Sequence, residues 1–538
     1  MKNFLLLFTT VLALIAFPKA NYAQAPNLGT AVNFVIFSTD GAVSNTGISQ
    51  LTGNVGTNNG SSTAFGNVNG VMHDNDGASA QCAADLLIAY NQLNSTIPTD
   101  FPAPLLGNGV TLVAGVYSIA STASLNLDLT LDAKGNSNAV FIFQIGGAFS
   151  TNASSQIKLI NGAMACNVFW KIEGLVDMAS GTTMRGTIIA NNAAIIMHTG
   201  STLEGRALST TGAITVDGIL AFTPIGCGSP TLTGPLAPDL ASTACYTLFS
   251  ANGSVTNTGI TTVDGSVGTN VGITSGYDPL LVSGTIHPIP DASTANCAAD
   301  LLKVYNYLNV LPSDIELLYP AQFGNDLVLT PHTYIMNAAA ELTGSVYLNA
   351  QGNADAVFVI QINGALSTST YSNVILMNGA QAKNVYWKIE GAVSINNYSI
   401  FRGTIICNNG ALGALNTGVT LDGRALTTSG SLTTNAVTTT MIPNCTGTGN
   451  ASLENTNHAV SIYPNPFTNS MVITVNDVSQ IKNCELRIYN ILGVEVKNIL
   501  ITKQITTLET SNFPTGIYFY KMIGNNKTIQ SGKLISKQ

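Results

Sequence analysis

The sequence predicts a mainly β protein with two tandem β-solenoid domains, each flanked by one α-helix, and a small C-terminal β-sandwich. Three observations support this fold class. A segment of about 200 residues occurs twice in the 538-residue chain, and the composition changes sharply over the last 80 residues. Each copy consists of short runs in which apolar and polar residues alternate. Because such short strands cannot bury an inward face alone, we expect them to stack as rungs.

The duplication is visible as matching segments in the same order. Phe37 to Thr57 recurs as Phe249 to Thr269, with 12 of 21 positions identical. The first copy continues with CAADLL, GNSNAVFIFQI, NVFWKIEG and EGRAL, and the second with CAADLL, GNADAVFVIQI, NVYWKIEG and DGRAL. The spacing between the copies drifts only from 212 to 218 residues, so a whole domain is duplicated.

One helical segment interrupts the strands of each copy. Residues Ala80 to Leu93 carry apolar side chains at helical spacing, and the matching segment runs from Asn296 to Leu308. We expect each helix to cover one face of its stack.

The domain boundaries follow from the repeat, the linkers and the N-terminal segment. Lys2 and the apolar run from Phe4 to Phe17 are typical of a secretory signal that is too short to span a bilayer. We divide the chain into a signal peptide (1–23), a first solenoid (26–227), a Pro-rich linker (228–243), a second solenoid (244–446), a polar linker (447–458) and a C-terminal domain (459–538).

The composition indicates an ordered protein with a nearly neutral surface. Charged residues make up 9% of the chain and apolar residues 45%, whereas charged residues reach about 25% in average domains. Residues 24–458 hold ten basic and 24 acidic residues, a formal net charge of −14 without a basic patch. Nucleic acid and anionic membranes are therefore not expected as partners.

Small hydroxyl residues recur at the turns of the first copy. When four rungs are aligned on their apolar residues, we predict two columns on one flat face. The first column is Ser121, Thr151, Ser180 and Thr199, and the second is Ser124, Ser154, Thr183 and Thr202. A flat uncharged array with a rung repeat of about 4.7–4.9 Å can order water into an ice-like layer. The alternative is that Thr is simply common in strands and Ser and Gly in turns.

With these segments the chain resembles the solenoid-plus-helix ice-binding (antifreeze) proteins of cold-adapted bacteria, fungi and algae. The resemblance rests on NTGI followed by GNVGT, CAADLL, NVFWKI, RGTI, GRAL and rung segments of the form T-A/G-x-T/N, over about 420 residues. It implies a discontinuous right-handed β-solenoid of triangular section that adsorbs to an ice crystal surface through one flat face. It implies no cofactor, metal or catalytic residue, and we expect a monomer.

The second copy departs from this pattern. Its counterparts of the four rungs are Ala338 and Glu341, Thr368 and Tyr371, Asn397 and Ile400, and Thr417 and Thr420. Only Thr417 and Thr420 keep both hydroxyls. We therefore expect the first copy to carry most of the ice affinity and the second to be weaker or a spacer.

Other polar residues allow a second class of function. Five that recur in both copies are Lys171, Glu173, Arg185, Glu204 and Arg206. They are candidates for an acid-base cluster like that of β-helical polysaccharide lyases, but we favour salt bridges that close the turns. The carboxylates of His73 to Gly77 have calcium-like spacing, yet the rest of an EF-hand is missing, so we expect a turn.

The eight cysteines fit an oxidising compartment. We expect structural roles for them, mainly disulfides, because a catalytic Cys needs a His partner and the five histidines do not recur between the copies. Their pairing stays open.

The C-terminal domain resembles the sorting domain of the type IX secretion system of Bacteroidetes. The resemblance rests on YPNPF at Tyr463 to Phe467, the NILG turn and the GIYFYK strand, and an adhesive Ig-like module is the alternative. It implies a Gram-negative host that moves the protein across its outer membrane. Two hypotheses therefore remain for the whole chain. The first is a secreted ice binder, and the second is a cell-surface adhesin or polysaccharide-binding solenoid, with residual lyase activity as an option.

Overall fold

A computed structural model describes residues 23–227, 231–440, 460–475, 484–491, 494–524 and 527–537. Most of the expected signal peptide, all of the second linker and Cys445 lie outside these residues. The chain divides into two compact units, residues 1–443 and 444–538. The first unit holds two β-solenoids, as the sequence predicts, here called solenoid 1 (residues 23–227) and solenoid 2 (residues 244–440).

Among the described residues, each solenoid is built from one large and one eight-stranded sheet. The 13-stranded sheet of solenoid 1 comprises β1 (Phe34–Ser38), β3 (Gln50–Thr52), β4 (Asn54–Thr57), β6 (Met72–Asp74), β8 (Thr111–Val113), β9 (Gly115–Ile119), β11 (Asp128–Asp132), β12 (Phe141–Ile145), β14 (Gln156–Ile160), β15 (Val168–Ile172), β17 (Thr183–Ala190), β19 (Thr202–Ser209) and β21 (Leu220–Phe222). Its eight-stranded sheet comprises β2 (Val43–Thr46), β5 (Ser62–Thr63), β7 (Leu105–Gly107), β10 (Ala123–Asn126), β13 (Phe149–Thr151), β16 (Val176–Met178), β18 (Ile195–Met197) and β20 (Ile214–Asp217).

Solenoid 2 repeats this plan within residues 244–440. Its 14-stranded sheet comprises β22 (Tyr246–Ser250), β24 (Thr262–Val263), β25 (Ser266–Thr269), β27 (Ile286–His287), β28 (Ile315–Glu316), β30 (Leu327–Leu329), β31 (Thr333–Met336), β33 (Ser345–Asn349), β34 (Phe358–Ile362), β36 (Asn373–Met377), β37 (Val385–Glu390), β39 (Ile400–Asn408), β41 (Thr420–Thr427) and β43 (Thr438–Thr440). Its eight-stranded sheet comprises β23 (Val255–Thr258), β26 (Thr274–Ser275), β29 (Phe323–Gly324), β32 (Ala340–Thr343), β35 (Leu366–Thr368), β38 (Val393–Ile395), β40 (Leu412–Leu415) and β42 (Leu432–Asn435).

The order of the rungs in the stack differs from their order in the sequence. In solenoid 1 the first strand, β1, pairs with β19 near the C-terminal end of the domain, and β4 and β6 follow outside it. Helix α2 (Gly77–Ser95) then leads to the opposite end, from which the later rungs return. A 19-residue helix is about 28 Å long, which matches about six rung spacings. The helix therefore has the length that the stack requires.

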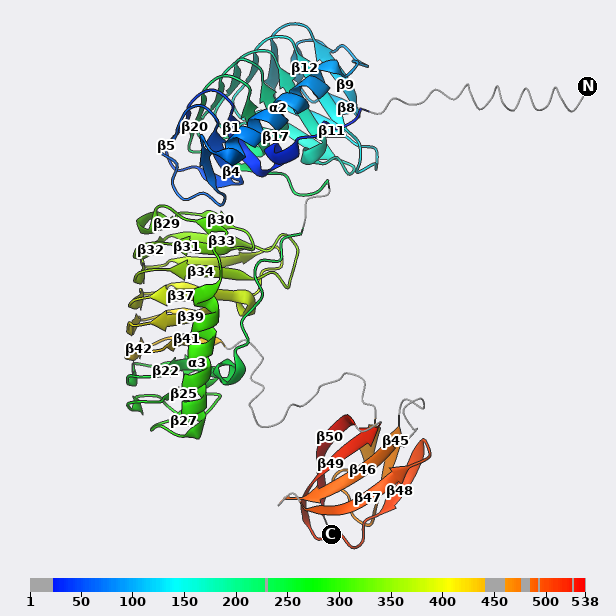
Figure 1. Ribbon diagram of the computed structural model, residues 1–538, viewed down its shortest axis with the longest axis vertical. Coiled ribbons are helices and arrows are strands. Elements are labelled where there is room, and N and C mark those ends of the chain that lie inside the picture. The colour runs from blue at the N-terminus through cyan, green and yellow to red at the C-terminus, as the bar shows by residue number, and fades with distance from the viewer. Residues whose placement is uncertain are drawn as a thin grey trace, which may run out of the picture. The chain divides into compact units, whose positions relative to one another are not determined.

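The two helices have the positions that the sequence predicts, and at 19 residues each they extend beyond both ends of the segments that the apolar spacing indicates. Helix α3 (Ala292–Val310) is the counterpart of α2, and each helix runs along one side of its stack (Figure 1). The buried side of α2, including Cys82 and Leu86, packs against Phe37, Ile142 and Ile189 of the large sheet. One face of each solenoid is therefore covered by a helix.

Each helix begins at an aspartate that a histidine contacts. Asp76 and Asp291 accept hydrogen bonds from the backbone N–H groups of Ser79 and Thr294, which is the geometry of a capping box. His73 Nδ1 lies 2.7 Å from Asp76, and His287 Nδ1 lies 2.6 Å from Asp291. The interpretation that no histidine recurs is wrong for this pair, because the loop to the helix differs by one residue and conceals the match.

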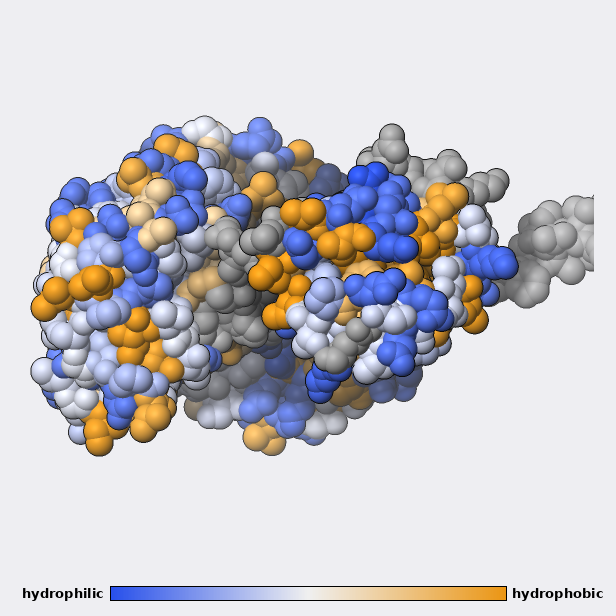
Figure 2. All heavy atoms as spheres, turned by 90° about the horizontal axis from the view of Figure 1, so that it is seen from below, coloured by the Kyte–Doolittle hydropathy of each residue, from blue (hydrophilic) through white to orange (hydrophobic). Residues whose placement is uncertain are grey.

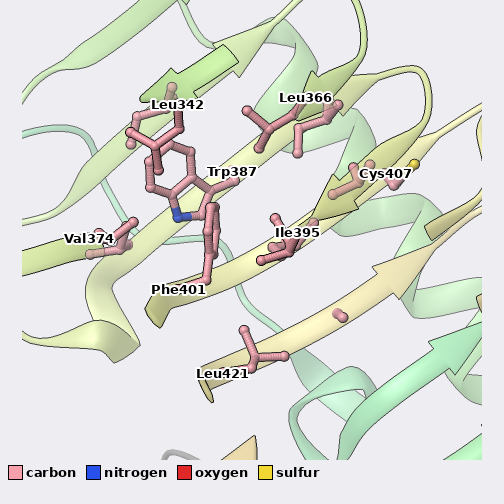
Figure 3. Close-up of a cluster of buried hydrophobic side chains, with 14 of the residues drawn as sticks. Leu342, Leu366, Val374, Trp387, Ile395, Phe401, Cys407 and Leu421 are labelled. Atoms are coloured by element: carbon pink, nitrogen blue, oxygen red, sulfur yellow. The ribbon is translucent and has the colours of Figure 1, made fainter. Parts of the chain in front are cut away.

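The interiors are filled by inward side chains of successive rungs. In solenoid 2 the rings of Trp387 and Phe401 lie together among Leu342, Leu366 and Ile395, all pointing into the stack (Figure 3). Trp170 is the counterpart of Trp387 in solenoid 1, and both indole N–H groups donate to backbone carbonyls at 2.9 Å. This donation satisfies a polar group that burial would otherwise leave unpaired.

The cysteines only partly follow the expectation of disulfides. Cys166 pairs with Cys227, and Cys245 is also disulfide-bonded. The expectation is wrong for Cys82, Cys297 and Cys407, which are buried thiols. Burial raises the pKa of the Cys82 thiol, so this side chain behaves as a small apolar residue.

The described part of the first linker packs against solenoid 2. Val357 N donates to Thr233 O at 2.9 Å, and Tyr307 Oη donates to Leu236 O at 2.8 Å.

Five short helices connect other segments: η1 (Gly29–Asn33), η2 (Ala165–Asn167), η3 (Ala241–Cys245), η4 (Pro320–Gln322) and η5 (Ala382–Asn384). No described helix is both long and apolar enough to cross a membrane.

The second unit is a small antiparallel β-sandwich. Its three-stranded sheet comprises β44 (Val460–Tyr463), β45 (Ser470–Val475) and β48 (Ile505–Glu509), and its four-stranded sheet comprises β46 (Cys484–Asn490), β47 (Glu495–Ile501), β49 (Gly516–Gly524) and β50 (Lys527–Ser536). Side chains of both sheets, among them Ile473 and Leu486, form one core.

The visible surface of the molecule carries hydrophobic residues in separate patches among pale and hydrophilic ones (Figure 2).

Candidate functional site

Each solenoid has three sides, and they differ in what they offer to a ligand. The first side is covered by the helix. The second is the remaining part of the large sheet, and it carries ion pairs. Arg185 Nε lies 2.8 Å from Glu204 Oε2, and Lys158 Nζ lies 2.5 Å from Asp128 Oδ2. The third side is the eight-stranded parallel sheet, which is neither covered by the helix nor crossed by these ion pairs.

The register of the eight-stranded sheet of solenoid 2 fixes an outward column of small side chains. These residues alternate with buried ones such as Val255 and Leu432, so their side chains face solvent. From end to end the column is Ser275, Thr256, Thr433, Ala414, Ser394, Ser367 and Glu341, with a register irregularity near Ala414. One carboxylate, at the last position, interrupts an otherwise neutral column.

A second outward column runs beside it at the end of the same strands. Thr258 pairs with Asn435, and Asn416 Nδ2 donates to Asn396 Oδ1 at 3.0 Å. Such amide contacts between rungs fix the side chains in one orientation. Apart from Glu341 at one end, the eight-stranded face of solenoid 2 therefore presents neutral hydroxyl, amide and methyl groups at the rung spacing.

The matching face of solenoid 1 is less uniform. Its first column is Thr63, Ser44, Thr215, Ile196, Asp177, Ser150, Ser124 and Leu105. His198 Nε2 lies 3.1 Å from Asp177 Oδ1, and Asp217 accepts a 2.6 Å hydrogen bond from Thr199. That bond from Thr199 is the main reason why the pKa of Asp217 lies below its ordinary value. This face therefore carries two carboxylates, an imidazole and two branched aliphatic side chains, Ile196 and Leu105.

The structure brings together only half of the hydroxyl columns predicted for solenoid 1. Thr183 pairs with Thr202, and Ser180 and Thr199 lie at the same corner of successive rungs, where Gly181 N donates to Thr199 O. These four residues belong to the last two rungs, in sequence order, of the predicted columns. Thr183 and Thr202 begin the ion-paired side, so the columns follow the corner between two sides and do not lie on the eight-stranded face.

The predicted register is wrong for the first two rungs in sequence order, those of Ser121 and Ser124 and of Thr151 and Ser154. Ser124 lies on the eight-stranded face beside Ser150, and Ser121 lies at the corner before that face. Thr151 is 6% exposed and its Oγ1 lies 2.7 Å from Thr182 Oγ1, so it points into the interior. Ser154 is exposed at the corner.

The predicted register fails because some hydroxyl side chains of these turns point into the interior and form hydrogen bonds there. Ser155, Thr182 and Ser201 are at most 1% exposed. The Oγ atoms of Ser155 and Ser201 donate to backbone carbonyls of the adjacent rung at 3.2 Å. Because a buried hydroxyl must be hydrogen-bonded, these residues hold rungs together, and sequence patterns do not distinguish them from exposed ones.

The counterparts predicted in solenoid 2 are also displaced. Ile400 pairs with Thr420 on the large sheet, and Thr368 is buried. Tyr371 lies at the corner, whereas Glu341 does lie on the eight-stranded face. Two of the three bulky or charged residues that suggested a weak second copy are therefore off this face.

The recurring charged residues do not form one cluster. Lys171 and Glu173 form an ion pair beneath α2, where Tyr90 and Asn191 donate to Glu173 at 2.7 Å. Burial acts to raise the pKa of Glu173, but hydrogen bonds from Lys171, Asn191 and Tyr90 outweigh it and lower the pKa.

The other members of the set lie elsewhere. Arg206 is buried and donates to Val32 O at 2.9 Å, while Arg185 and Glu204 lie on the ion-paired side. Within the described residues, no group of three or more His, Cys, Asp or Glu side chains could hold a metal ion. Of His73 to Gly77, the first two residues end β6, Asn75 and Asp76 form the turn, and Gly77 begins α2.

Comparisons with known proteins agree with this geometry. Residues 37–220 and 249–440 match the ice-binding-like family, and residues 461–537 match the secretion system C-terminal sorting domain family. An ice-binding protein of Nostoc sp. (strain HG1) is 40% identical over 218 residues, which are 39% of this chain and 80% of that protein. One of Flavobacterium frigoris (strain PS1) is 31% identical over 203 residues, 34% of this chain and 72% of that protein.

A solved structure matches both solenoids together. The crystal structure of an ice binding protein from an Antarctic Flavobacteriaceae bacterium is 61% identical, with a TM-score of 0.78. The match covers 78% of this chain and 100% of that chain.

Proposed function

The chain belongs to the ice-binding-like family, and from this membership we propose that it is an antifreeze protein that adsorbs to ice and inhibits ice growth and recrystallisation. Its C-terminal sorting domain is that of a secretion system and directs the protein to the outer cell surface or the medium. We expect it to act without catalysis, without nucleic acid and as a monomer.

We further propose that the eight-stranded faces are the ice-contacting surfaces, and that the face of solenoid 2 is the stronger one. The neutral outward column from Ser275 to Ser367 supports this choice. A charged side chain keeps its own hydration shell, so Asp177 and Asp217 weaken the match of solenoid 1 to an ordered water layer. Ser180, Thr183, Thr199 and Thr202 extend the contact of solenoid 1 at its corner, and Thr417 and Thr420 hold the matching places in solenoid 2.

The proposal is tested by thermal hysteresis and ice-crystal shaping of the full chain. The substitutions Thr256→Tyr and Thr433→Tyr place rings in the middle of the proposed face, and we expect them to remove most of the hysteresis. Thr440→Tyr is the matched control, because Thr440 is an exposed threonine on the large sheet and pairs with Asp422 on the ion-paired side.

The expected result is a large loss in the double variant and none in the control, with unchanged circular dichroism. Absence of hysteresis in the unmodified protein would contradict the function. Equal activity of all three proteins would contradict the choice of face.

A further inference from the structure

Solenoid 2 carries a pair of stacked tyrosines at the corner that follows its eight-stranded sheet. The ring centroids of Tyr371 and Tyr398 are 5.1 Å apart, with an angle of 17° between the planes. The two residues are 71% and 51% exposed. They lie in adjacent rungs, where Tyr371 N donates to Asn397 O at 3.0 Å, so the stacking follows the rung spacing.

Both tyrosines have a backbone conformation that disfavours large side chains. Their φ angles are 60° and 59°, in the left-handed region, which costs free energy for a bulky residue. The same corner in the next rungs is occupied by Gly418 and Ala436, also at positive φ. In solenoid 1 the matching residues are Ser154 and Gly181. The turn itself therefore does not require aromatic residues.

The pair is supported on one side and open on the other. A Cβ atom at Gly418 would lie 2.4 Å from Tyr398 Cδ1, so the Tyr398 ring rests against the glycine backbone. The rung beyond Tyr371 has Gly344 at this position, and a Cβ there would meet nothing within 4 Å. No side chain at that position covers the outer ring face of Tyr371.

The neighbouring groups are polar and uncharged. Thr370 and Asn397 are exposed beside the two rings, and we call Thr370, Tyr371, Asn397, Tyr398 and Gly418 the tyrosine ledge. It combines an open aromatic face with hydroxyl and amide groups and carries no charge. Ligand sites commonly combine an aromatic surface with a few placed hydrogen-bonding groups, and the absence of charge on the ledge suits a neutral ligand.

We propose that the tyrosine ledge binds a neutral polysaccharide chain. The C–H face of a pyranose ring stacks on the open face of Tyr371, while ring hydroxyls exchange hydrogen bonds with the Thr370 hydroxyl, the Asn397 amide and the phenol groups. Such a site holds the secreted protein in extracellular polysaccharide without using the eight-stranded face. The strain of the two tyrosines is then retained for binding, as strain at functional sites commonly is.

Binding of the full-length protein to a panel of neutral polysaccharides (a β-1,4-glucan, a β-1,3-glucan, a xylan and a galactomannan) tests this by affinity electrophoresis and pull-down. The substitutions Tyr371→Ser and Tyr398→Gly install the residues of solenoid 1 at this corner. We expect them to weaken binding about tenfold or more, as the loss of an aromatic side chain does for a stacked nucleic-acid base. We also expect the melting temperature to stay or rise, because the left-handed strain is relieved.

Ile260→Ser is the matched control. Ile260 is an aliphatic residue, 79% exposed, at the same corner of another rung, and its loss is expected to leave polysaccharide binding unchanged. Thermal hysteresis of all variants separates this site from the ice site, because the ledge substitutions leave the eight-stranded face, Thr417 and Thr420 unchanged and are expected not to lower it.

Three outcomes would overturn the proposal. These are no binding of the unmodified protein to any member of the panel, equal binding of the ledge variant, and self-association by sedimentation that the ledge variant abolishes. The last result would make the pair a contact between two copies of the chain.

Discussion

Solenoids 1 and 2 share their interiors and differ on their exposed faces. Both bury a tryptophan that donates to a backbone carbonyl at 2.9 Å, and both cap their helix with an aspartate. On the eight-stranded face, by contrast, Asp177 of solenoid 1 has the neutral counterpart Ser394. The stack is fixed by inward residues, whereas outward residues are free to diverge, and function has to be assigned from the outward residues.

The shared interior predicts similar stability losses in both copies. Trp170 stacks on Phe143 at 4.0 Å, and Trp170→Ala should cost about 3–5 kcal/mol, as large-to-small substitutions of buried aromatics do. Trp387→Ala should cost a similar amount in solenoid 2. Denaturant unfolding of each variant measures this, and a loss below 1 kcal/mol in one copy alone would break the comparison.

A disulfide is a place where the two copies differ in covalent structure. Cys166 is bonded to Cys227, 61 residues later, whereas Lys383 holds the matching place in solenoid 2. The double substitution Cys166→Ser and Cys227→Ser should lower the stability by about 2–4 kcal/mol, mainly through the unfolded chain. Calorimetry should assign the loss to solenoid 1, and Lys383→Ser is the control without effect.

The helix caps predict a smaller effect with a defined pH dependence. The backbone N–H of Ser79 is the main cause that holds the pKa of Asp76 below its ordinary value. The stabilisation is therefore present above the unfolded pKa of about 3.9 and is lost as the pH falls through the lower folded value.

Asp76→Ala should cost about 1 kcal/mol at pH 7. Asp76→Asn should retain most of the cap but lose this acid dependence. Thermal melts between pH 2 and pH 7 compare the variants, and an unchanged acid profile for Asp76→Asn would contradict the account.

The smallest effect that we expect is a gain in thermal hysteresis. Asp177→Ser combined with His198→Asn gives solenoid 1 the residues found at Ser394 and Asn416 of solenoid 2. We expect a modest rise in thermal hysteresis, because the Asp177 carboxylate with its hydration shell is removed from the proposed face. A fall in hysteresis at unchanged folding would show that Asp177 and His198 support ice contact.

Much of the fold was predictable because duplication, alternation and helical spacing are all local signals. The rung register was not, because a strand pattern has a period of two. When one rung is shifted by one or two residues at a turn, its apolar residues can still be aligned with those of the neighbouring rung. Thr151 shows the consequence, since its sequence environment resembles that of Thr199 but its hydroxyl bonds inside the stack.

Other features of the candidate site depend on pairings between distant segments. The neutral column of solenoid 2 joins Thr256 to Thr433, residues 177 positions apart, because the first strands insert beside the last rungs. No sequence window contains both residues. The equivalence of His73 and His287 was concealed in a similar way by a loop that differs in length.

Matched rings on the two eight-stranded faces test directly which solenoid makes the principal ice contact. Thr256→Tyr with Thr433→Tyr and Ser44→Tyr with Thr215→Tyr occupy equivalent positions in solenoids 2 and 1. Thermal hysteresis of the two full-length variants should fall much further for the solenoid 2 pair. A larger loss from the solenoid 1 pair, with both proteins folded, would contradict the account and return the principal ice contact to the first copy.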